Sequence, residues 1–249
     1  MGAAPIAPEI LQFFFASGVP VMEGYGMTET STSATVNRPH AGQFRFGSVG
    51  KPQKNVEVKI ADDGEILIKG ANIFRGYYKN DDASFGAVEE GWLHTGDIGS
   101  LDDDGFLYIT GRKKDIIITA GGKNITPANL EAEIKQSPYV SQCVVIGDRR
   151  PFLSALVTLD IEEVAKLAEE KGWPSDPAAL AENPDMRALI QQHIDQINEK
   201  FARVEQVKKF EILPADLSQE GGELTPTLKV KRNIVADKYA GEIESLYSS

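Results

Sequence analysis

The apolar positions at the start of the chain change from a helical period to an extended one. Residues 8–16 are predicted to form a helix, because their apolar side chains recur on one helix face, at Ile10, Leu11, Phe14 and Phe15. The next apolar run, 19–22, predicts a buried strand, which leads into a glycine-rich turn at Gly24 and Gly26. A turn of this kind after a strand is a common place for a phosphate to approach the backbone.

From about residue 44, short strand-like runs replace the helical period. Three runs are predicted to be strands, at 56–60, 65–69 and 106–110. Turn sequences rich in aspartate and glycine separate them, at 62–64 and 102–105. Such spacing predicts a small β-barrel or sandwich subdomain over about 44–111. Calcium binding at 102–105 is an alternative, but the spacing does not fit an EF-hand loop and favours a solvated hairpin turn.

After Arg112, predicted strands and helices alternate. The strands are predicted at 116–119, 140–146, 153–159 and 207–212. Four helices are predicted. The first begins at Pro127 with Thr126 as cap, and the second spans 161–171 before Gly172. The third follows an apolar stripe from Met186 to Phe201, and the fourth spans 231–246. His193 lies on that stripe and is interpreted as a packed residue rather than a ligand. The glycine-rich segment 219–227 is predicted to be a loop of low order.

These patterns predict a mixed chain, α/β and α+β, of two domains. The length of 249 residues allows one or two domains, and the change of pattern at Arg112 favours two. The first domain is predicted to span 1–111 and to contain the β-rich subdomain. The second is predicted to be a small α+β domain over 112–249, with a hinge at 112–115.

Composition and charge limit the class of function. The net charge of −11 disfavours binding to a nucleic acid polymer but leaves room for a local cationic pocket for one nucleotide. The single cysteine, Cys143, excludes a disulfide within the chain, fits a reducing compartment and is interpreted as a core residue. The sequence has no apolar run of about 18 residues and no signal-peptide pattern. We therefore predict a cytoplasmic protein whose membrane association is peripheral at most.

The glycine-rich turn carries the first candidate chemistry. Tyr25, between Gly24 and Gly26, offers an aromatic face for a base, and the glycines let the backbone approach a ligand. Thr28 can give a hydroxyl to a phosphoryl oxygen, and Glu29 can hold Mg²⁺ with phosphate as the other ligand. The alternative interpretation is an ordinary glycine turn with a capping Thr-Glu pair.

Asp97 and Arg112 have the chemistry to bind a ribose. A carboxylate at the turn Thr95-Gly96-Asp97 can accept both ribose hydroxyls, and Arg112 at a strand end can reach ribose or phosphate oxygens. For Asp97, the alternative is the role of an ordinary turn residue. His94 is interpreted as structural rather than catalytic.

Two lysines suit a part of the chain that moves. Lys114 stands where the pattern changes and can absorb the dihedral change of a hinge, although Lys113 and Lys114 could also be solvated charges. Lys229 follows the glycine-rich loop, which could deliver its charge to a reacting phosphate. The alternative is a basic helix start on the surface, where Lys231 and Arg232 compete for the role.

Four segments together resemble the adenylate-forming superfamily of acyl-CoA synthetases, non-ribosomal adenylation domains and luciferases. They are Gly24-Tyr25-Gly26-Met27-Thr28-Glu29, Trp92-Leu93-His94-Thr95-Gly96-Asp97, the run from Gly111 to Asn124, and Leu224-Thr225-Pro226-Thr227-Leu228-Lys229. Their order and spacing match over essentially the whole chain. The Gly121-Gly122-Lys123-Asn124 run, the helical insertion before Lys229 and the ending at Lys229 look most like bacterial long-chain fatty acyl-CoA synthetases.

The resemblance implies a role for each matching residue. Gly2, Ala3, Ala4 and Pro5 would line the adenine, and the turn of Gly24, Tyr25, Gly26 and Met27 would bind the nucleotide, with Tyr25 stacked on the base. Thr28 and Glu29 would serve the α-phosphate and Mg²⁺, and Asp97, Ile109 and Arg112 would surround the ribose. Lys114 matches the hinge, Lys229 matches the lysine that catalyses adenylation, and the segment that meets the pantetheine arm of CoA is matched by Gly121, Gly122 and Lys123.

The implied reaction joins a fatty carboxylate to ATP, giving acyl-adenylate and pyrophosphate, after which the CoA thiol gives the thioester and AMP. Rotation about Lys114 would exchange Lys229 for the Gly121-Gly122 face between the two steps. The resemblance also implies an upstream domain with a pyrophosphate-binding loop and a fatty-acid tunnel. We therefore expect a C-terminal portion of a longer enzyme that is inactive alone in full turnover. The alternatives are a fatty acyl-AMP ligase or adenylation domain that delivers to a carrier protein, and a non-catalytic nucleotide-binding module.

Overall fold

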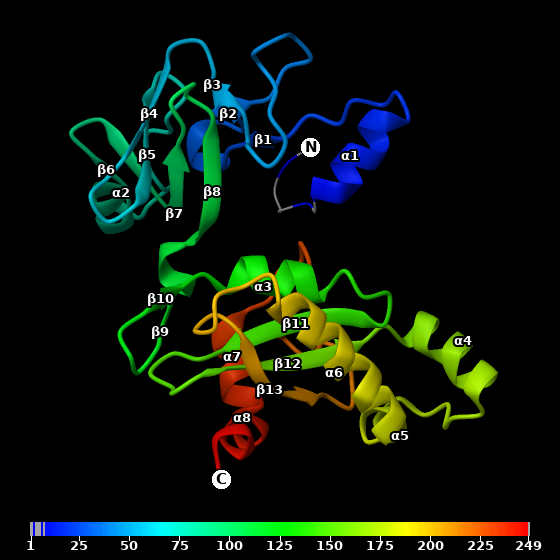
Figure 1. Ribbon diagram of the computed structural model, residues 1–249. Helices are drawn as coiled ribbons and strands as arrows, with labels where there is room; N and C mark the ends of the chain where they lie inside the picture. The colour runs from blue at the N-terminus through cyan, green and yellow to red at the C-terminus, as the bar shows by residue number, and fades with distance from the viewer. Residues whose placement is uncertain (1, 3–5, 7, 249) are drawn as a thin grey trace. The chain divides into compact units, whose positions relative to one another are not determined.

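A computed structural model describes residues 2, 6 and 8–248 (Figure 1). The chain divides into two compact units, residues 1–115 and residues 116–249. Both units mix helices and strands, which confirms the predicted fold class. The predicted domain boundary after residue 111 and the hinge at 112–115 stay predictions, because two compact units do not by themselves establish a motion.

The first unit is built mainly of short strands. Its elements are α1 (Pro8–Ala16), β1 (Gly24–Tyr25), the 3₁₀ turn η1 (Thr28–Thr30), β2 (Thr35–Val36), β3 (Lys51–Pro52), β4 (Val56–Ile60), β5 (Glu65–Gly70), α2 (Asp81–Ala87), β6 (Val88–Glu89), β7 (Trp92–Leu101), β8 (Leu107–Arg112) and the 3₁₀ turn η2 (Lys113–Asp115). One sheet has the order β4-β5-β7-β6, with β8 also paired to β7, and a second sheet has the order β1-β2-β3.

The core of the first unit forms where alternate strand residues turn inward. Ile66 and Ile68 of β5 and Leu107 of β8 are fully buried and pack with Tyr25 and Ala34. The long strand β7 pairs with β5, β6 and β8, and its register shifts beside Gly99. A Cβ at Gly99 would lie 2.3 Å from the carbonyl oxygen of Tyr108, so this close strand contact requires glycine.

Most predicted elements of the first unit are confirmed. The helix 8–16 and the strand 56–60 have the predicted bounds, and β5 and β8 differ from the predictions by one or two residues. The predicted strand 19–22 is wrong: the segment has no regular structure. Pro20 lacks an amide donor, and no strand pairs with this segment in the part of the chain that the structure describes. β7 was not predicted, because glycine and polar residues interrupt its apolar pattern.

Helix α1 leaves an unusual amount of aromatic surface exposed. It buries Leu11, which is 1% exposed, but Phe13, Phe14 and Phe15 remain 67%, 41% and 49% exposed. The ring of Phe15 stacks on Phe44 at a centroid distance of 5.6 Å. A contiguous apolar surface of this kind marks a region that commonly contacts another protein part.

The second unit alternates strands and helices. Its elements are β9 (Ile117–Ile118), β10 (Asn124–Ile125), α3 (Pro127–Ile134), β11 (Val140–Ile146), β12 (Leu153–Leu159), α4 (Ile161–Lys171), α5 (Pro177–Ala181), α6 (Pro184–Asn198), β13 (Val207–Ile212), α7 (Arg232–Lys238) and α8 (Ala240–Tyr247). β11 and β12 are antiparallel, β13 runs parallel to β12, and β9 and β10 form a separate short hairpin.

Helices cover both faces of the sheet β11-β12-β13 (Figure 1). Cys143 and Val145 of β11 face a core that includes buried residues of α3, α4, α5 and α6. Val144, between them, faces a second core with α7 and α8. The period of two therefore gives β11 two buried faces, which explains its continuous apolar sequence. Cys143 is buried as predicted, and burial raises the pKa of its thiol well above the ordinary value.

Three predictions in the second unit need correction. The predicted helix 231–246 is divided into α7 and α8 at Tyr239, whose backbone leaves the helical region at φ −107° and ψ 30°. Thr126 stands at the N-cap position of α3, but its side chain makes no capping hydrogen bond. α6 ends at Asn198 rather than continuing to residue 201, and the N–H groups of Lys200 and Phe201 bond the carbonyl oxygens three residues earlier, as in a turn.

The packed role of His193 is confirmed, with Nε2 3.0 Å from the carbonyl oxygen of Ile134. None of the helices in the described residues is both long and apolar enough to cross a membrane.

Candidate functional site

Tyr25, Asp97 and Arg112 form a compact polar cluster in the first unit. β7 and β8 pair with Asp97 opposite Arg112, so the antiparallel register places these side chains together. Asp97 is 5% exposed; its Oδ2 accepts a hydrogen bond from the Tyr25 hydroxyl at 2.6 Å and its Oδ1 accepts one from Arg112 Nε at 3.0 Å. Burial and the Asp97 carboxylate both raise the pKa of Tyr25, so its hydroxyl stays a donor.

This cluster retains hydrogen-bonding capacity. Each Asp97 oxygen has a second lone pair, and the Arg112 side chain is 49% exposed with further N–H donors. Tyr25 is only 9% exposed, so most of its ring is packed in the core rather than presented to solvent. Ile109 of β8 packs against the same core.

The glycines of the turn have a packing role that the sequence pattern did not reveal. A Cβ at Gly26 would lie 2.0 Å from the carbonyl oxygen of Thr32, and one at Gly2 would lie 2.8 Å from that of Gly24. The protein backbone itself therefore excludes side chains at Gly2 and Gly26. Ala3, Ala4 and Pro5, predicted to line the adenine, lie outside the described residues.

Thr28 and Glu29 lie on η1, directly after Met27. Thr28 is exposed, and Glu29 Oε1 accepts a hydrogen bond from the Tyr77 hydroxyl at 2.8 Å. The N–H of Phe74 donates to the Glu29 carbonyl oxygen at 2.8 Å, which holds the same turn from its backbone side. The hydrogen bond to Glu29 raises the pKa of Tyr77. Sequence reasoning missed Tyr77, although its place after Gly76 in a loop was an available signal.

A metal ion at Glu29 would need ligands beyond the protein carboxylates. In the described residues, no group of three or more His, Cys, Asp or Glu side chains is placed to hold a metal ion. The donor set at η1 is one partly exposed carboxylate with a hydroxyl beside it. This fits Mg²⁺, which commonly takes one or two carboxylates and completes its octahedron with phosphate oxygens and water.

Asp97 lies within β7 and not at the predicted turn. Glu65 holds the part of β7 that carries Asp97, and sequence reasoning missed Glu65. Its carboxylate accepts hydrogen bonds from the Gly96 N–H at 2.8 Å and from Lys113 Nζ at 3.0 Å, and lies 3.2 Å from His94 Nδ1. Burial raises the pKa of Glu65, but the bonds to Lys113, Gly96 and His94 outweigh burial and hold it below its ordinary value. His94 therefore takes part in a structural contact, in line with its interpretation.

The two lysines at the unit boundary differ in their contacts. Lys113 Nζ lies 2.6 Å from Asp63 and 3.0 Å from Glu65, so it is anchored within the first unit rather than simply solvated. Lys114 is exposed and has no ion pair with the residues that the structure describes.

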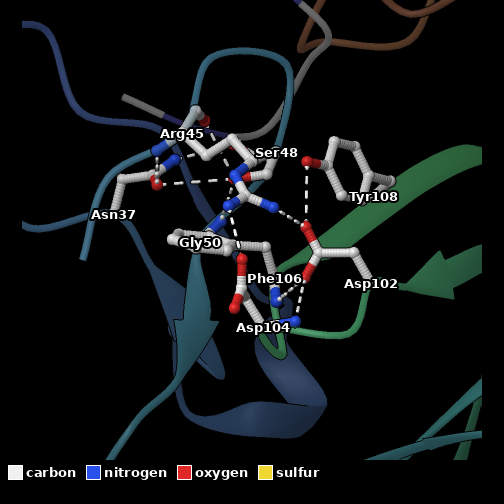
Figure 2. Close-up of polar contacts among 8 residues, drawn as sticks. All are labelled: Asn37, Arg45, Ser48, Gly50, Asp102, Asp104, Phe106 and Tyr108. Carbon is white, nitrogen blue, oxygen red and sulfur yellow. Dashed lines mark hydrogen bonds and ion pairs between the residues drawn. The ribbon is translucent and has the colours of Figure 1, made fainter. Parts of the chain in front are cut away.

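The aspartate-rich turn 102–105 binds an arginine. Figure 2 shows the Arg45 guanidinium between Asp102 and Asp104, with Nη2 2.7 Å from Asp104 and the guanidinium carbon 4.5 Å from the Phe106 ring centroid. Burial opposes ionisation of Asp102, but hydrogen bonds from the Phe106 N–H and Arg45 hold its pKa below the ordinary value. The hairpin-turn interpretation is confirmed, because the turn joins the paired strands β7 and β8. The cation that contacts the carboxylates of Asp102 and Asp104 is the Arg45 guanidinium.

In the second unit, Gly121, Gly122 and Lys123 lie in the exposed turn between β9 and β10. The Gly122 N–H donates to the Thr119 carbonyl oxygen at 2.8 Å, and the Thr119 N–H donates to that of Lys123 at 3.1 Å. Gly122 has φ +74°, which favours glycine. A Cβ at Gly122 would meet no described atom within 4 Å, so space beside this turn is open, in contrast to the packed glycine at 26.

Lys229 is exposed near the tip of a short hairpin, and its side chain has no hydrogen bond or ion pair with the described residues. The hairpin is closed by a β-bridge between Leu224 and Val230. The predicted low order of 219–227 is wrong for its middle part, because Leu224 is 6% exposed and Glu223 is 1% exposed. Burial of these two side chains anchors the loop although it has no regular structure.

Comparisons with known proteins agree with the motifs. The family model described as AMP-binding enzyme C-terminal domain matches residues 114–249, and the one described as AMP-binding enzyme matches residues 1–78. A protein named long-chain-fatty-acid–CoA ligase from Mycobacterium bovis is 44% identical over 249 residues, covering 99% of this chain and 41% of the relative. One of that name from Homo sapiens is 38% identical over 271 residues, covering 99% of this chain and 37% of the relative. The chain thus spans about two fifths of the length of these relatives.

Solved structures agree as well. O-succinylbenzoate coenzyme A synthetase from Bacillus subtilis, in complex with ATP and magnesium ion, has a TM-score of 0.71 at 28% identity, covering 93% of this chain and 44% of that one. The adenylation domain of a carboxylate reductase from Mycobacterium chelonae shares the fold, with a TM-score of 0.79 at 24% identity over 100% of this chain and 38% of that one. The chain belongs to the AMP-binding enzyme family, the adenylate-forming superfamily that its motifs resemble.

Proposed function

We propose that this chain is the C-terminal portion of an ATP-dependent long-chain fatty acid–CoA ligase, which adenylates a fatty carboxylate and then transfers the acyl group to CoA. The observation that carries the proposal is the hydrogen-bonded cluster of the buried Tyr25 and Asp97 with the half-exposed Arg112. It lies on the family motifs and offers a carboxylate and a guanidinium to one polar ligand. The names of the relatives supply the acyl and acceptor classes.

Asp97 would bind the two ribose hydroxyls. Its carboxylate is oriented before the ligand arrives, because the Tyr25 hydroxyl and Arg112 Nε each hold one oxygen. Arg112 would supply its remaining N–H donors to the ribose or a phosphate. Tyr25 would stack on the base, and Ile109 would pack nearby.

Thr28 and Glu29 would act at the α-phosphate. The Thr28 hydroxyl would donate to a phosphoryl oxygen, and Glu29 would hold Mg²⁺, which supplies charge neutralisation of the phosphates when bound. The Tyr77 hydroxyl bonds only Oε1 of Glu29, so a metal ion at the other carboxylate oxygen is compatible with this hydrogen bond. The turn of Gly24, Gly26 and Met27, which directly precedes Thr28 and Glu29, would hold these two residues in place and bind the nucleotide.

Lys114 would be the hinge. Arg112 and Lys113 are bonded within the first unit, and Ile117 is buried in the core of the second. Lys114 lies between these fixed points, exposed and without an ion pair among the described residues, so its dihedral angles can change without breaking a side-chain contact. Lys229 would stabilise the charge on the reacting α-phosphate in the first step and be withdrawn in the second.

The acceptor would be CoA. The exposed turn of Gly121, Gly122 and Lys123 would meet the pantetheine arm after the rotation, and the open space beside Gly122 is compatible with a narrow ligand at that turn. Fatty acyl transfer to a carrier protein is the second candidate. A thiol-acceptor assay with CoA and with a phosphopantetheinyl carrier protein separates the two, because only the favoured acceptor sustains turnover.

The rest of the enzyme would contribute the pyrophosphate-binding loop and the fatty-acid tunnel. The chain spans 41% of the length of its mycobacterial relative, and the exposed Phe13, Phe14 and Phe15 of α1 suit a surface that further protein covers. The protein would work on small molecules in the cytoplasm, with membrane association peripheral at most.

Calorimetric titration tests the nucleotide site directly. The chain is titrated with AMP and with a non-hydrolysable acyl-adenylate analogue, as wild type and as Asp97→Ala. Binding that Asp97→Ala weakens about 10- to 100-fold is the expected result. Equal binding by both proteins contradicts the assignment of Asp97. If neither protein binds, the same titration of the full-length enzyme decides whether the upstream part completes the site or the proposal fails.

A further inference from the structure

The hairpin that carries Lys229 is fixed at both of its ends. Before the hairpin, the Glu223 carboxylate accepts hydrogen bonds from Lys238 Nζ and from the Tyr239 hydroxyl, the latter at 3.3 Å. After it, Arg232 Nη2 donates to both carboxylate oxygens of Glu131, at 2.6 Å and 2.5 Å. The residues on both sides of the hairpin, Glu223 and Arg232, are therefore held by side-chain contacts. The residues at its tip are not held by these contacts.

Thr225 provides that support through two separate bonds to Lys229. The Thr225 N–H donates to the Lys229 carbonyl oxygen at 2.8 Å, and the Lys229 N–H donates to Thr225 Oγ1 at 3.0 Å. Both backbone groups of Lys229 are thus held by one residue, which fixes the direction of its Cα–Cβ bond. The Thr225 hydroxyl proton is free to donate to Thr227 Oγ1, 3.1 Å away.

The residue before Lys229 adopts a costly backbone conformation. Leu228 has φ +59°, in the left-handed region, and its side chain is 63% exposed, so burial of that side chain does not compensate the strain. The Leu228 N–H donates to the Thr225 carbonyl oxygen at 2.9 Å. Strain of this kind persists where surrounding bonds determine the conformation, and it concentrates at functional positions.

We infer that Thr225 is a positioning residue for adenylation: its hydroxyl holds the Lys229 backbone so that the lysine side chain leaves the hairpin in one direction. The inference rests on the proposed function, because it presumes that Lys229 acts on the α-phosphate. Thr225 would act through Lys229 and not on the substrate itself. Without the hydroxyl, the Lys229 amide loses its acceptor, the tip gains alternative conformations, and the charge is presented correctly for a smaller fraction of the time.

The variants separate the hydroxyl from the shape of the side chain. Thr225→Val has nearly the same volume but no acceptor, and Thr225→Ser keeps the acceptor without the methyl group. Thr227→Val is the matched control, because its hydroxyl is paired with that of Thr225 but not with Lys229. All are made in the full-length enzyme.

The first readout is hydrogen exchange of the Lys229 amide, measured by mass spectrometry with fragmentation to single residues. We expect exchange to be about 3- to 10-fold faster in Thr225→Val, the range for loss of one hydrogen bond. Thr225→Ser and Thr227→Val should stay close to wild type. Unchanged exchange in Thr225→Val would overturn the inference, whatever happens to activity.

The second readout is the rate of each half-reaction. Thr225→Val should slow adenylation by about 10-fold at saturating ATP and fatty acid, should leave thioester formation from supplied acyl-adenylate unchanged, and should be rescued by Thr225→Ser. An equal decrease in the rates of both half-reactions would contradict the positioning role of Thr225 and leave it only a structural role. A normal adenylation rate despite faster hydrogen exchange of the Lys229 amide would do the same. If Lys229→Ala also adenylates normally, the proposed role of Lys229 fails rather than that of Thr225 alone.

Discussion

The groups proposed to recognise adenosine and the group proposed to catalyse adenylation of the carboxylate are held in opposite ways. In the first unit, Asp97 is 5% exposed and bonded to Tyr25 and Arg112. In the second unit, the Lys229 side chain is exposed and makes no polar contact with the described residues, while only its backbone is fixed. A group that recognises a ligand in every step benefits from fixed orientation, whereas a group needed in one step must be able to leave.

Loss of the Lys229 amine should have the largest effect. We expect Lys229→Ala in the full-length enzyme to slow adenylation by about 10²–10³-fold, the scale for one preorganised charge contact at a transition state. Thioester formation from supplied acyl-adenylate should stay within about 2-fold of wild type. Rapid-quench assays of the two half-reactions measure both rates, and Lys231→Ala, which removes a neighbouring charge, is the control. A Lys231→Ala enzyme with the larger defect would move the role to that residue.

Loss of the Asp97 carboxylate should come next. Asp97→Ala removes an acceptor and leaves Arg112 and the Tyr25 hydroxyl without their buried partner, so AMP affinity should fall about 10- to 100-fold. Calorimetry measures the affinity. Asp104→Ala is a matched control on the turn after β7, since its carboxylate bonds Arg45 instead. A comparable loss in that control would indicate general destabilisation of the unit.

Removal of the Tyr77 hydroxyl should have a smaller effect, confined to Mg²⁺. Tyr77→Phe frees the Glu29 carboxylate to rotate, so the Mg²⁺ concentration for half-maximal adenylation should rise about 3- to 10-fold while the rate at saturating Mg²⁺ is retained. Tyr78 is the neighbouring tyrosine and is 88% exposed, so Tyr78→Phe should leave the Mg²⁺ titration unchanged. The same Mg²⁺ titration curve for both variants would contradict the proposal that the Tyr77 hydroxyl orients Glu29 for Mg²⁺ binding.

Glu65 should contribute the smallest effect, visible as a pH dependence of stability. Its folded-state pKa lies below the ordinary value of 4.5, so its stabilisation is present above that pH and is lost as the pH falls through the folded-state pKa. Glu65→Gln should lower the free energy of unfolding by about 1–2 kcal/mol at pH 7 and by less below pH 4. Urea unfolding at both pH values measures this, and a pH-independent loss would contradict the assignment.

The sequence predicted what depends on local pattern and chain order. The helix 8–16, the strands 56–60 and 140–146, and the motif residues were visible because their periodicity or spacing is contained within a few positions. The predicted strand at 19–22 failed because a strand needs a partner, which no local pattern supplies.

The polar partners of the motif residues could not be predicted for the same reason. Tyr77 lies 48 positions from Glu29, and Glu65 lies 31 positions from Gly96, so only the folded sheet brings each pair together. Asp97 and Arg112 are separated by 15 positions and meet through the register of β7 and β8. The side chains of the motifs were thus predictable, whereas the contacts between them and the partners outside the motifs, Tyr77 and Glu65, were not.

The most direct test of the contrast between the two units is the ratio of the half-reaction rates in two variants of the full-length enzyme. Adenylation and thioester formation are measured at sub-saturating ligand for Asp97→Ala and for Lys229→Ala. Because Asp97 would hold the nucleotide in both steps, we expect Asp97→Ala to slow both and to leave their ratio within about 3-fold of wild type. Lys229→Ala should change the ratio by about 10²-fold or more. Equal ratios in the two variants would contradict the account of a fixed recognition site and a delivered catalytic lysine.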